Sequence, residues 1–337
     1  MTAINSATDR NQAASLKPLM HLVASDMQAV NQVILDRMQS EVPLIPELAG
    51  HLISSGGKRM RPMLMLACSR LIGEPRDIHY KLAAAIEFIH TATLLHDDVV
   101  DHSDLRRGKR TANNIWGNGS TVLVGDFLLS RAFEMMVESG SLRALEILSN
   151  AAAIITQGEV DQLVSQYQVE TDEARYLSII GAKTAVLFAA SCRIAAVMAG
   201  CSKDKEQSLA DYGQYLGIAF QLTDDAIDYM SDSQTMGKGV GDDFRDGKVT
   251  LPVILAYQRG EKADRDFWRE AIEGRRVADS DLDIAKILLV NTDALSDTLE
   301  RARLYGEKAI QSLEAFPDGA VKEALIEAVE FTIARAY

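Results

Sequence analysis

The sequence of 337 residues predicts an all-α protein that forms one large domain. None of its seven prolines lies between Pro75 and Pro252, and a proline in a helix interior costs about 3 kcal/mol, so this stretch can be helical. Apolar residues recur within it at mixed spacings of three and four, and no alternating strand pattern of useful length interrupts them. No change in composition marks a linker, and 47% hydrophobic residues can supply a large core.

The polar first fifteen residues lack the apolar core of a secretory signal. They predict a flexible tail over residues 1–15, followed by one domain over residues 16–337. Several expected helices are rich in alanine or apolar almost all round, which is typical of helices buried in a bundle. Turn signals at residues 117–119, 139–141 and 200–203 separate expected helices at 82–100, 122–137, 142–167 and 184–199.

Charge and cysteine usage exclude several classes of protein. A net charge of −13 argues against nucleic-acid binding, because neutralising phosphates requires a basic surface. Cys68, Cys192 and Cys201 are odd in number and lack metal-binding spacing, so we expect no disulfide framework, no zinc site and a cytoplasmic location. No stretch reaches the roughly 20 apolar residues of a transmembrane helix. The nearest one, at residues 185–200, contains Ser191 and Arg193.

Two copies of one acidic pentapeptide are the most informative motif in the chain. They read DDVVD at residues 97–101 and DDAID at residues 224–228. In a helix the first and fifth residues of such a motif lie about 40° apart on one face, with the second beside them. Two like charges about 4 Å apart cost roughly 4 kcal/mol at an effective dielectric near 20, so a cation is expected there. The six carboxylates belong to Asp97, Asp98, Asp101, Asp224, Asp225 and Asp228.

A single acidic cluster at helical spacing is often only a solvated face. Here, however, apolar stretches at residues 91–95 and 217–222 precede the clusters, where a solvent-facing helix would carry Lys and Glu. We therefore expect the carboxylates to face inward. Magnesium prefers carboxylate oxygens, waters and phosphates, so two such clusters facing each other across a cavity would form a diphosphate clamp.

Basic motifs flank both clusters. Residues 56–62 read GGKRMRP and residues 106–110 read RRGKR, and arginine forks with nearby glycines suit anionic oxygens. A Gly/Asp-rich loop at residues 237–252 carries Lys238 and Lys248 and four glycines, so it is a candidate flap over a bound polyanion. Solvated surface remains the alternative for each run. In so acidic a chain we favour binding of an anion.

In this order and spacing the motifs resemble those of the trans-isoprenyl diphosphate synthases, from about residue 20 to the C-terminus. Lys183-Thr184 and Phe220-Gln221 belong to the same pattern. The resemblance, in particular to bacterial octaprenyl and decaprenyl synthases, implies the isoprenoid synthase fold: a bundle of helices around a central cavity, usually in a homodimer. It implies that an allylic diphosphate, farnesyl or geranylgeranyl, ionises with the help of three magnesium ions. The resulting carbocation is then attacked by isopentenyl diphosphate.

The resemblance also implies roles for individual residues. The six aspartates hold magnesium, and the carbonyl of Lys183 with Thr184 and Gln221 lies near the carbocation. No protein nucleophile is needed, since released diphosphate can remove the proton, and catalysis is orientation plus preorganised charge. The residues implied to contact the allylic diphosphate are Arg106, Lys183, Lys238 and Lys248. Those implied to contact isopentenyl diphosphate are Lys58, Arg61, His90 and Arg107. The residues counted as catalytic are Lys183, Thr184, Gln221 and Lys238.

Two histidines precede the first cluster. A helical histidine is more often packed or solvent-facing than a ligand, and we expect this of His96. His90 lies two turns before Asp97 on the same face and matches a substrate-binding position of the family.

Product length depends on the residues ahead of the first cluster. In short-chain relatives bulky aromatics five and four positions before the first aspartate plug the product channel, whereas this chain has Ala92 and Thr93. The next bulky candidates are Phe133, Met135 and Met136, although such residues are commonly plain core. We therefore expect a product of about C40 to C50, such as the side chain of ubiquinone, with transient membrane contact for its release.

Three alternatives stay open. A short-chain synthase would make a C15 or C20 product. A class I terpene cyclase shares the bundle and one acidic motif, but usually lacks the GGKRxRP motif seen at residues 56–62. A non-catalytic partner subunit would have lost acidic motifs, whereas all six aspartates are present here.

Overall fold

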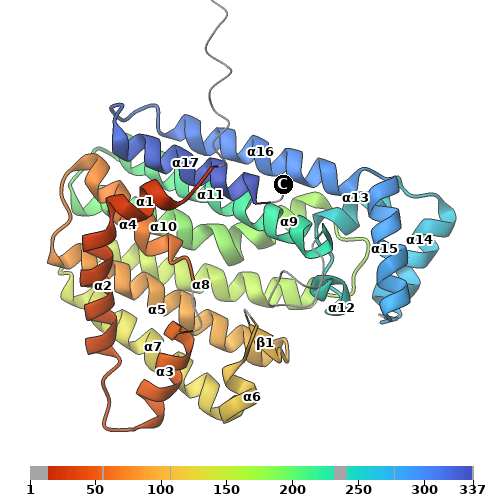
Figure 1. Cartoon of the computed structure of the whole chain (residues 1–337), viewed down its shortest axis with the longest axis horizontal. Helices are drawn as coiled ribbons and strands as arrows, with labels where there is room; N and C mark the ends of the chain where they lie inside the picture. Colours follow the sequence, from red (N-terminus) through yellow and green to blue (C-terminus); the bar gives the residue numbers. More distant parts are fainter. Residues whose placement is uncertain (1–13, 55–56, 107, 231–240, 277, 336–337) are drawn as a thin grey trace, which may run out of the picture.

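The computed structural model describes residues 14–335 except 55–56, 107, 231–240 and 277, and over these residues the protein is a helical bundle (Figure 1). Strands among the described residues are confined to a short antiparallel hairpin in which β1 (Leu105–Arg106) pairs with β2 (Lys109–Arg110). The prediction of an all-α fold is confirmed.

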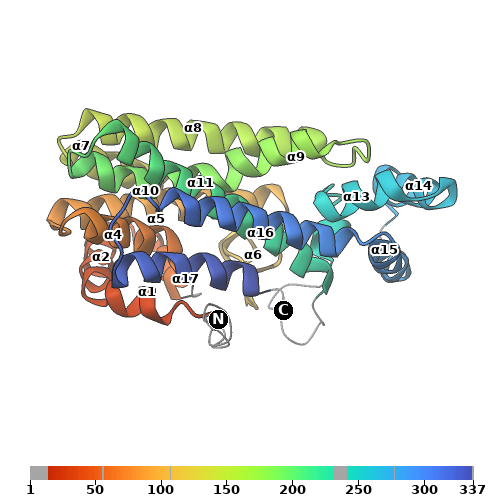
Figure 2. The ribbon, with the colours of Figure 1, turned by 90° about the horizontal axis from the view of Figure 1, so that it is seen from above.

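The centre of the bundle consists of long helices that run side by side. They are α5 (Asp77–Val100), α7 (Asn118–Glu138), α8 (Leu142–Ser165), α10 (Val186–Met198) and α11 (Lys203–Met230). In Figure 1, α10 lies between α8 and α11, and α7 packs along α5. Figure 2 shows α8 along one edge of the bundle. All four helices expected from the periodicity are present, although α8 ends two residues earlier than predicted and residues 184–185 belong to a π-helical turn ahead of α10. Their apolar faces join in one core.

Further helices cover this centre. α4 (Met60–Ile72) packs on α5 and α10, α16 (Ala294–Ser312) runs along α11, and α17 (Ala320–Ala334) contacts α1, α11 and α16. The remaining N-terminal elements are α1 (Lys17–Leu22), α2 (Ala24–Arg37), α3 (Leu44–Ser54) and α6 (Ala112–Trp116). Residues 14–16 precede α1 without regular structure, while most of the predicted tail lies outside the described residues.

Two glycines let α11 approach α10 closely. A Cβ at Gly213 would lie 2.4 Å from the carbonyl oxygen of Phe188, and one at Gly217 would lie 2.5 Å from the Cα of Ala185. Real Cβ atoms do not approach backbone so closely, so any larger residue would force the helices apart. These contacts set the position of the second acidic cluster, two turns further along α11.

A smaller group of helices projects from one end of the bundle, at the right of Figure 1. It has its own apolar cluster, in which the ring of buried Trp268 lies 6.3 Å from that of Phe244. Its elements are α12 (Asp242–Arg245), α13 (Leu251–Arg259), α14 (Lys262–Trp268), η2 (Arg269–Glu273) and α15 (Asp279–Asn291).

One segment of the described chain is long and apolar enough to cross a membrane. It runs over Glu173–Met198 and comprises α9 (Glu173–Ile180), the π-helical turn η1 (Gly181–Ala185) and α10. Of its most apolar window, 67% is buried inside the protein, as in the core helix of a bundle. Cys68 and Cys192 are buried in the same core as free thiols, and Cys201 is half-buried.

Candidate active site

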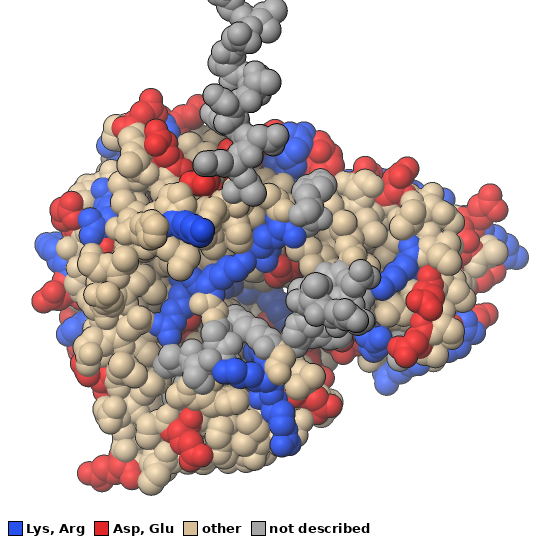
Figure 3. Space-filling model, in the orientation of Figure 1, with Lys and Arg blue, Asp and Glu red and all other residues tan. Residues whose placement is uncertain are grey.

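A cavity of about 780 Å³ lies between α5, α8, α9, η1 and α11. Figure 3 shows it as a hollow with Lys and Arg side chains along its rim. Arg107 and Lys238 lie outside the described residues, so the structure does not place them. The residues singled out from the sequence that line the cavity are Lys58, Arg61, His90, Thr93, Asp97, Asp101, Arg106, Lys183, Thr184, Gln221, Asp224, Asp225, Asp228 and Lys248.

Each carboxylate of the first acidic cluster meets a cation from another part of the chain. Asp98, 1% exposed, accepts hydrogen bonds from Nε and Nη2 of Arg106, at 2.9 and 2.7 Å. Such a forked ion pair fixes the end of α5 to the hairpin. The carboxylate of Asp98 is absent from the described cavity lining, whereas those of Asp97 and Asp101 are part of it.

The two cavity-facing carboxylates of this cluster each face a lysine. Nζ of Lys183 is 3.9 Å from Oδ2 of Asp97, and Nζ of Lys248 is 3.0 Å from Oδ2 of Asp101. Burial opposes the charge on Lys248, but Asp243, Asp101 and Asp246 together raise its pKa above the ordinary value. Lys248 is therefore a fixed cation in the lining of the cavity.

Neutral donors hold most of the second cluster. Asp225 accepts hydrogen bonds from the Tyr176 hydroxyl at 2.6 Å and from Nε2 of Gln221 at 2.7 Å, and Asp228 accepts one from the backbone N–H of Asp243 at 3.2 Å. Asp224 instead pairs with Nη2 of Arg335 at 2.8 Å.

Burial and neighbouring carboxylates disfavour negative charge on this wall. Burial, followed by the charge of Asp243, raises the pKa of Asp225 and that of Asp228 to about 8. Burial and Asp101 raise the pKa of Asp97 as well, against the opposing effect of Lys183. Both walls therefore bear carboxylates that a bound cation would stabilise.

The donor set fits magnesium. Within the described residues, no three His, Cys, Asp or Glu side chains converge closely enough to form a metal site by themselves. Magnesium, however, keeps several waters and takes one or two carboxylates together with substrate phosphates, so it does not require an all-protein cage. Asp97 and Asp101 on one wall and Asp224 and Asp228 on the other offer such hard oxygen donors.

Cations gather at the end of the cavity where α4 begins. Arg61 lies with its guanidinium 4.3 Å from the ring centre of Phe188, and its Nε has no hydrogen-bond partner in the described structure. Burial lowers its pKa to about 10, which leaves it charged at neutral pH. Lys58 lies over the ring of Phe331 at 4.4 Å. Together with His90 these groups form a pocket suited to an anion.

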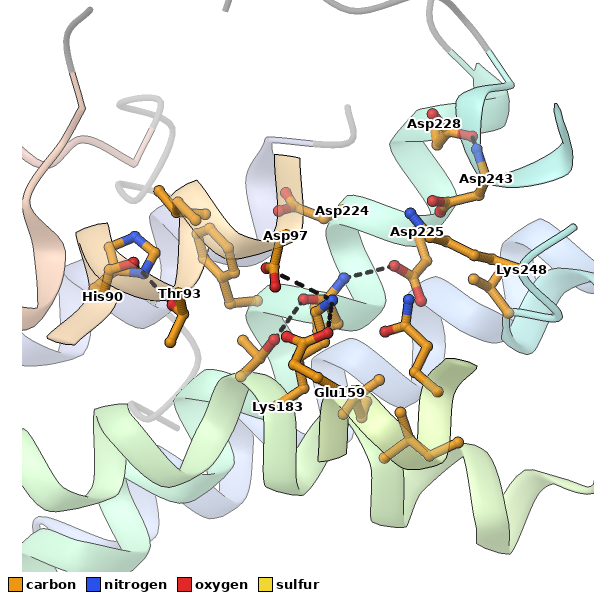
Figure 4. Close-up of a pocket in the computed structure, with 18 of the residues that line it drawn as sticks. His90, Thr93, Asp97, Glu159, Lys183, Asp224, Asp225, Asp228, Asp243 and Lys248 are labelled. Carbon is orange, nitrogen blue, oxygen red and sulfur yellow. Dashed lines mark hydrogen bonds and ion pairs between the residues drawn. The ribbon is translucent and has the colours of Figure 1, made fainter. Parts of the chain in front are cut away.

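The π-helical turn η1 carries Lys183 and Thr184 into the cavity, and π-helical turns are frequent at functional sites. The Thr184 hydroxyl donates to Oε1 of Gln221 at 2.8 Å, which links this turn to α11. In Figure 4, Lys183 points between Glu159 of α8 and Asp97 of α5. Its Nζ is 2.6 Å from Oε2 of Glu159.

The four residues expected to set product length lie in different surroundings. Thr93 lines the cavity, and Ala92 is buried beside it in α5. Phe133 is 39% exposed on α7, and Met136 is fully buried there, and neither belongs to the described lining. Of the four, only Thr93 belongs to the described cavity lining, and a role in setting product length stays a prediction for all four.

Sequence reasoning did not identify several residues of the site. Glu159, Tyr176, Asp243 and Arg335 all line the cavity, and each comes from a different helix or helix end than the two acidic motifs. Asp243 lies in the Gly/Asp-rich loop that the sequence indicated, whereas Glu159, Tyr176 and Arg335 belong to no motif recognised in the sequence. Glu159 follows Gly158 in α8, a helix in which the sequence indicated no site residue. Only the packing of α8 on η1 brings the Glu159 carboxylate to Lys183.

Comparisons with known proteins agree with this geometry. The sequence model of the family described as Polyprenyl synthetase matches residues 42–288. Octaprenyl diphosphate synthase of Escherichia coli is 44% identical over 324 residues, which cover 95% of this chain and 99% of the relative. The crystal structure of a polyprenyl synthase from Caulobacter crescentus, complexed with calcium and isoprenyl diphosphate, has a TM-score of 0.93 and 50% identity, with coverage of 97% and 99%. That of a decaprenyl diphosphate synthase from Rhodobacter capsulatus has a TM-score of 0.92 and 45% identity, with coverage of 96% and 100%.

Proposed function

The chain belongs to the polyprenyl synthetase family, and we propose that it makes an all-trans polyprenyl diphosphate of about C40 to C50. It is a prenyltransferase that elongates an allylic diphosphate with isopentenyl diphosphate. We take farnesyl or geranylgeranyl diphosphate as the primer. The observation that carries the proposal is the cavity itself, in which two aspartate-bearing walls face each other beside a separate pocket of cations.

Different residues of the cavity would bind the two diphosphate substrates. Lys183, Lys248 and Arg106 lie beside the first cluster and are suited to the allylic diphosphate, together with Lys238. Asp97, Asp101, Asp224 and Asp228 would hold magnesium, for which we propose three ions per site. Bound magnesium would neutralise the diphosphate and make it a better leaving group. The sequence also predicts that Asp98 and Asp225 hold magnesium. Because Asp98 is tied to Arg106 and Asp225 to Tyr176, we propose supporting roles for them instead.

The second substrate fits the other end of the cavity. Lys58, Arg61 and His90, with Arg107, would bind isopentenyl diphosphate and direct its double bond towards the allylic carbon. The Thr184 hydroxyl and Gln221 amide, already joined by a hydrogen bond, would orient their dipoles towards the developing cation. The cavity then acts by orientation and preorganised charge, and the released diphosphate takes the proton.

Exposed apolar side chains on α7 and α8 support a homodimer. Five of the large apolar residues there are 55–69% exposed, and exposed apolar side chains are typical of an interface when they are contiguous. We propose that a second copy of the chain covers this face. Its members are Leu123, Val137, Val160, Leu163 and Val164.

We further propose that residues 16–337 form one catalytic domain in the cytoplasm, where the buried thiols of Cys68 and Cys192 stay reduced. A polyprenyl chain of this length is insoluble in water, so release of the product would involve transient contact with a membrane. The ubiquinone side chain is a suitable destination for such a product.

Product sizing tests the proposal. Purified protein is incubated with magnesium, farnesyl diphosphate and labelled isopentenyl diphosphate, and the dephosphorylated products are separated by chromatography. We expect a C40 to C50 product, and we expect Thr93→Phe to shorten it to C15 or C20 because the ring would enter the cavity. Short products from the wild type would instead support a short-chain synthase. Absence of elongation would contradict the proposed function.

A further inference from the structure

We propose that Glu159 is a positioning residue, which holds the ammonium of Lys183 away from Asp97 until magnesium and the allylic diphosphate bind. The inference rests on the proposed function of the same cavity. It adds a third acidic group, from a third helix, to the two aspartate clusters that the sequence revealed.

The contacts of Lys183 are unequal. Its Nζ lies 2.6 Å from Oε2 of Glu159, a direct charged hydrogen bond, but 3.9 Å from Oδ2 of Asp97. All three side chains line the cavity and lie together in Figure 4, with Lys183 reaching up from η1 between the other two. Glu159 therefore holds the lysine, and Asp97 is the weaker competitor.

Close packing of the backbones of α8 and η1 brings Glu159 and Lys183 together. A Cβ at Gly158 would lie 2.9 Å from the Cβ of Ala182 and 2.9 Å from the backbone nitrogen of Lys183. A glycine at this point lets α8 touch the π-helical turn, and the next residue is then placed beside the Lys183 side chain. The contact is thus determined by two helices and does not depend on a loose surface pairing.

The consequence concerns the first metal-binding carboxylate. If Lys183 closed onto Asp97, an ammonium would occupy the place that a divalent cation requires, and the two would compete. Glu159 supplies an alternative partner that keeps Lys183 within reach of an incoming diphosphate. When the diphosphate arrives, Lys183 can exchange Glu159 for the more highly charged ligand.

An ordinary stabilising ion pair between neighbouring helices is the competing interpretation. The chain offers a matched example two residues further along α8, where Asp161 pairs with Nη2 of Arg175 on α9 at 2.8 Å. Neither residue of this second pair belongs to the described cavity lining. Asp161→Asn therefore removes a carboxylate of similar kind from the same helix and serves as the control.

The experiment compares Glu159→Gln with Asp161→Asn in the full chain. Binding of inorganic diphosphate is measured by calorimetry over a series of magnesium concentrations, and melting temperature is recorded in parallel. Glutamine keeps an oxygen acceptor but loses the charge, so Lys183 should turn towards Asp97. We expect the magnesium concentration for half-maximal binding to rise about tenfold in Glu159→Gln and to stay unchanged in Asp161→Asn.

A second pair of variants isolates the action through Lys183. In a Lys183→Met background, Glu159→Gln should leave the magnesium requirement unaltered, because there is no ammonium to position. Equal effects of Glu159→Gln and Asp161→Asn, or an undiminished effect of Glu159→Gln without Lys183, would overturn the inference. Failure of the proposed function would look different, since the wild type would then bind diphosphate with magnesium and yet form no polyprenyl product.

Discussion

The two aspartate clusters have the same sequence pattern but different partners. Lys183, Arg106 and Lys248 each bring a positive charge to a carboxylate of the first cluster. In the second cluster, Asp225 and Asp228 are held by a phenol, an amide and a backbone N–H, and their pKa values are raised to about 8 by burial and Asp243. Arg335 pairs with Asp224, so in the described part of the chain the second wall has one cationic partner where the first has three. Asp225 and Asp228 are therefore the carboxylates that depend most on an added cation.

The largest expected effect is common to both walls. Asp97→Ala and Asp224→Ala each remove a cavity-facing carboxylate that would hold magnesium, and we expect kcat to fall about 10³-fold, as for the loss of one strong electrostatic group in an active site. Steady-state elongation of farnesyl diphosphate measures this loss.

Asp211→Asn is the matched control for the second wall. Asp211 lies on the same helix, α11, where it accepts a hydrogen bond from Gln207 outside the described cavity lining. Its substitution should leave kcat within about twofold, since surface changes away from the site have small effects. A cluster variant that behaved like this control would show that its wall takes no part in catalysis.

The supports of the two clusters should differ in strength. Asp98→Asn breaks a forked ion pair in which the carboxylate is 1% exposed, and such a loss should cost about 3 kcal/mol of the free energy of unfolding. Tyr176→Phe deletes one hydroxyl from Asp225 and should cost about 1 kcal/mol. Urea unfolding without magnesium measures the free energy of unfolding of both variants. Equal losses would contradict the expectation that the ion pair of Asp98 stabilises the fold more than the hydrogen bond of Asp225.

The fold was largely predictable because its signals are local. Apolar spacing and the absence of proline between Pro75 and Pro252 predict the long helices, and α5, α7, α8 and α10 lie where the pattern indicated. The turn at Lys183 is instead π-helical, which no spacing of apolar residues distinguishes from an α-helical turn.

The site was predictable only where residue types repeat. The six aspartates form a visible motif, whereas Glu159, Tyr176 and Arg335 are single residues that reach the cavity through the packing of α8, α9 and the end of α17. The sequence also could not reveal that Asp98 turns to Arg106 while Asp97 and Asp101 face the cavity. Helical spacing predicts which face of the helix a residue occupies, but it does not predict which side chain of another element packs against that face.

The remaining expected effect is a dependence of stability on pH to which the second wall contributes most. With the pKa of Asp225 and Asp228 near 8 in the folded protein and about 4 when unfolded, the folded state holds more protons between these values. Without magnesium, stability should therefore fall as pH rises from 4 to 8.

Magnesium should reverse this loss by stabilising the ionised carboxylates. The rise in melting temperature that it causes should be larger at pH 8 than at pH 6 by a few degrees, since about 1 kcal/mol corresponds to about 2 °C in a protein of this size. Differential scanning calorimetry with and without magnesium measures it. Asp228→Asn should remove much of the pH dependence, whereas Asp97→Asn should retain most of it because Asp225 and Asp228 both remain. The opposite ranking of the two variants would reverse the comparison and make the first wall the one that depends on the metal.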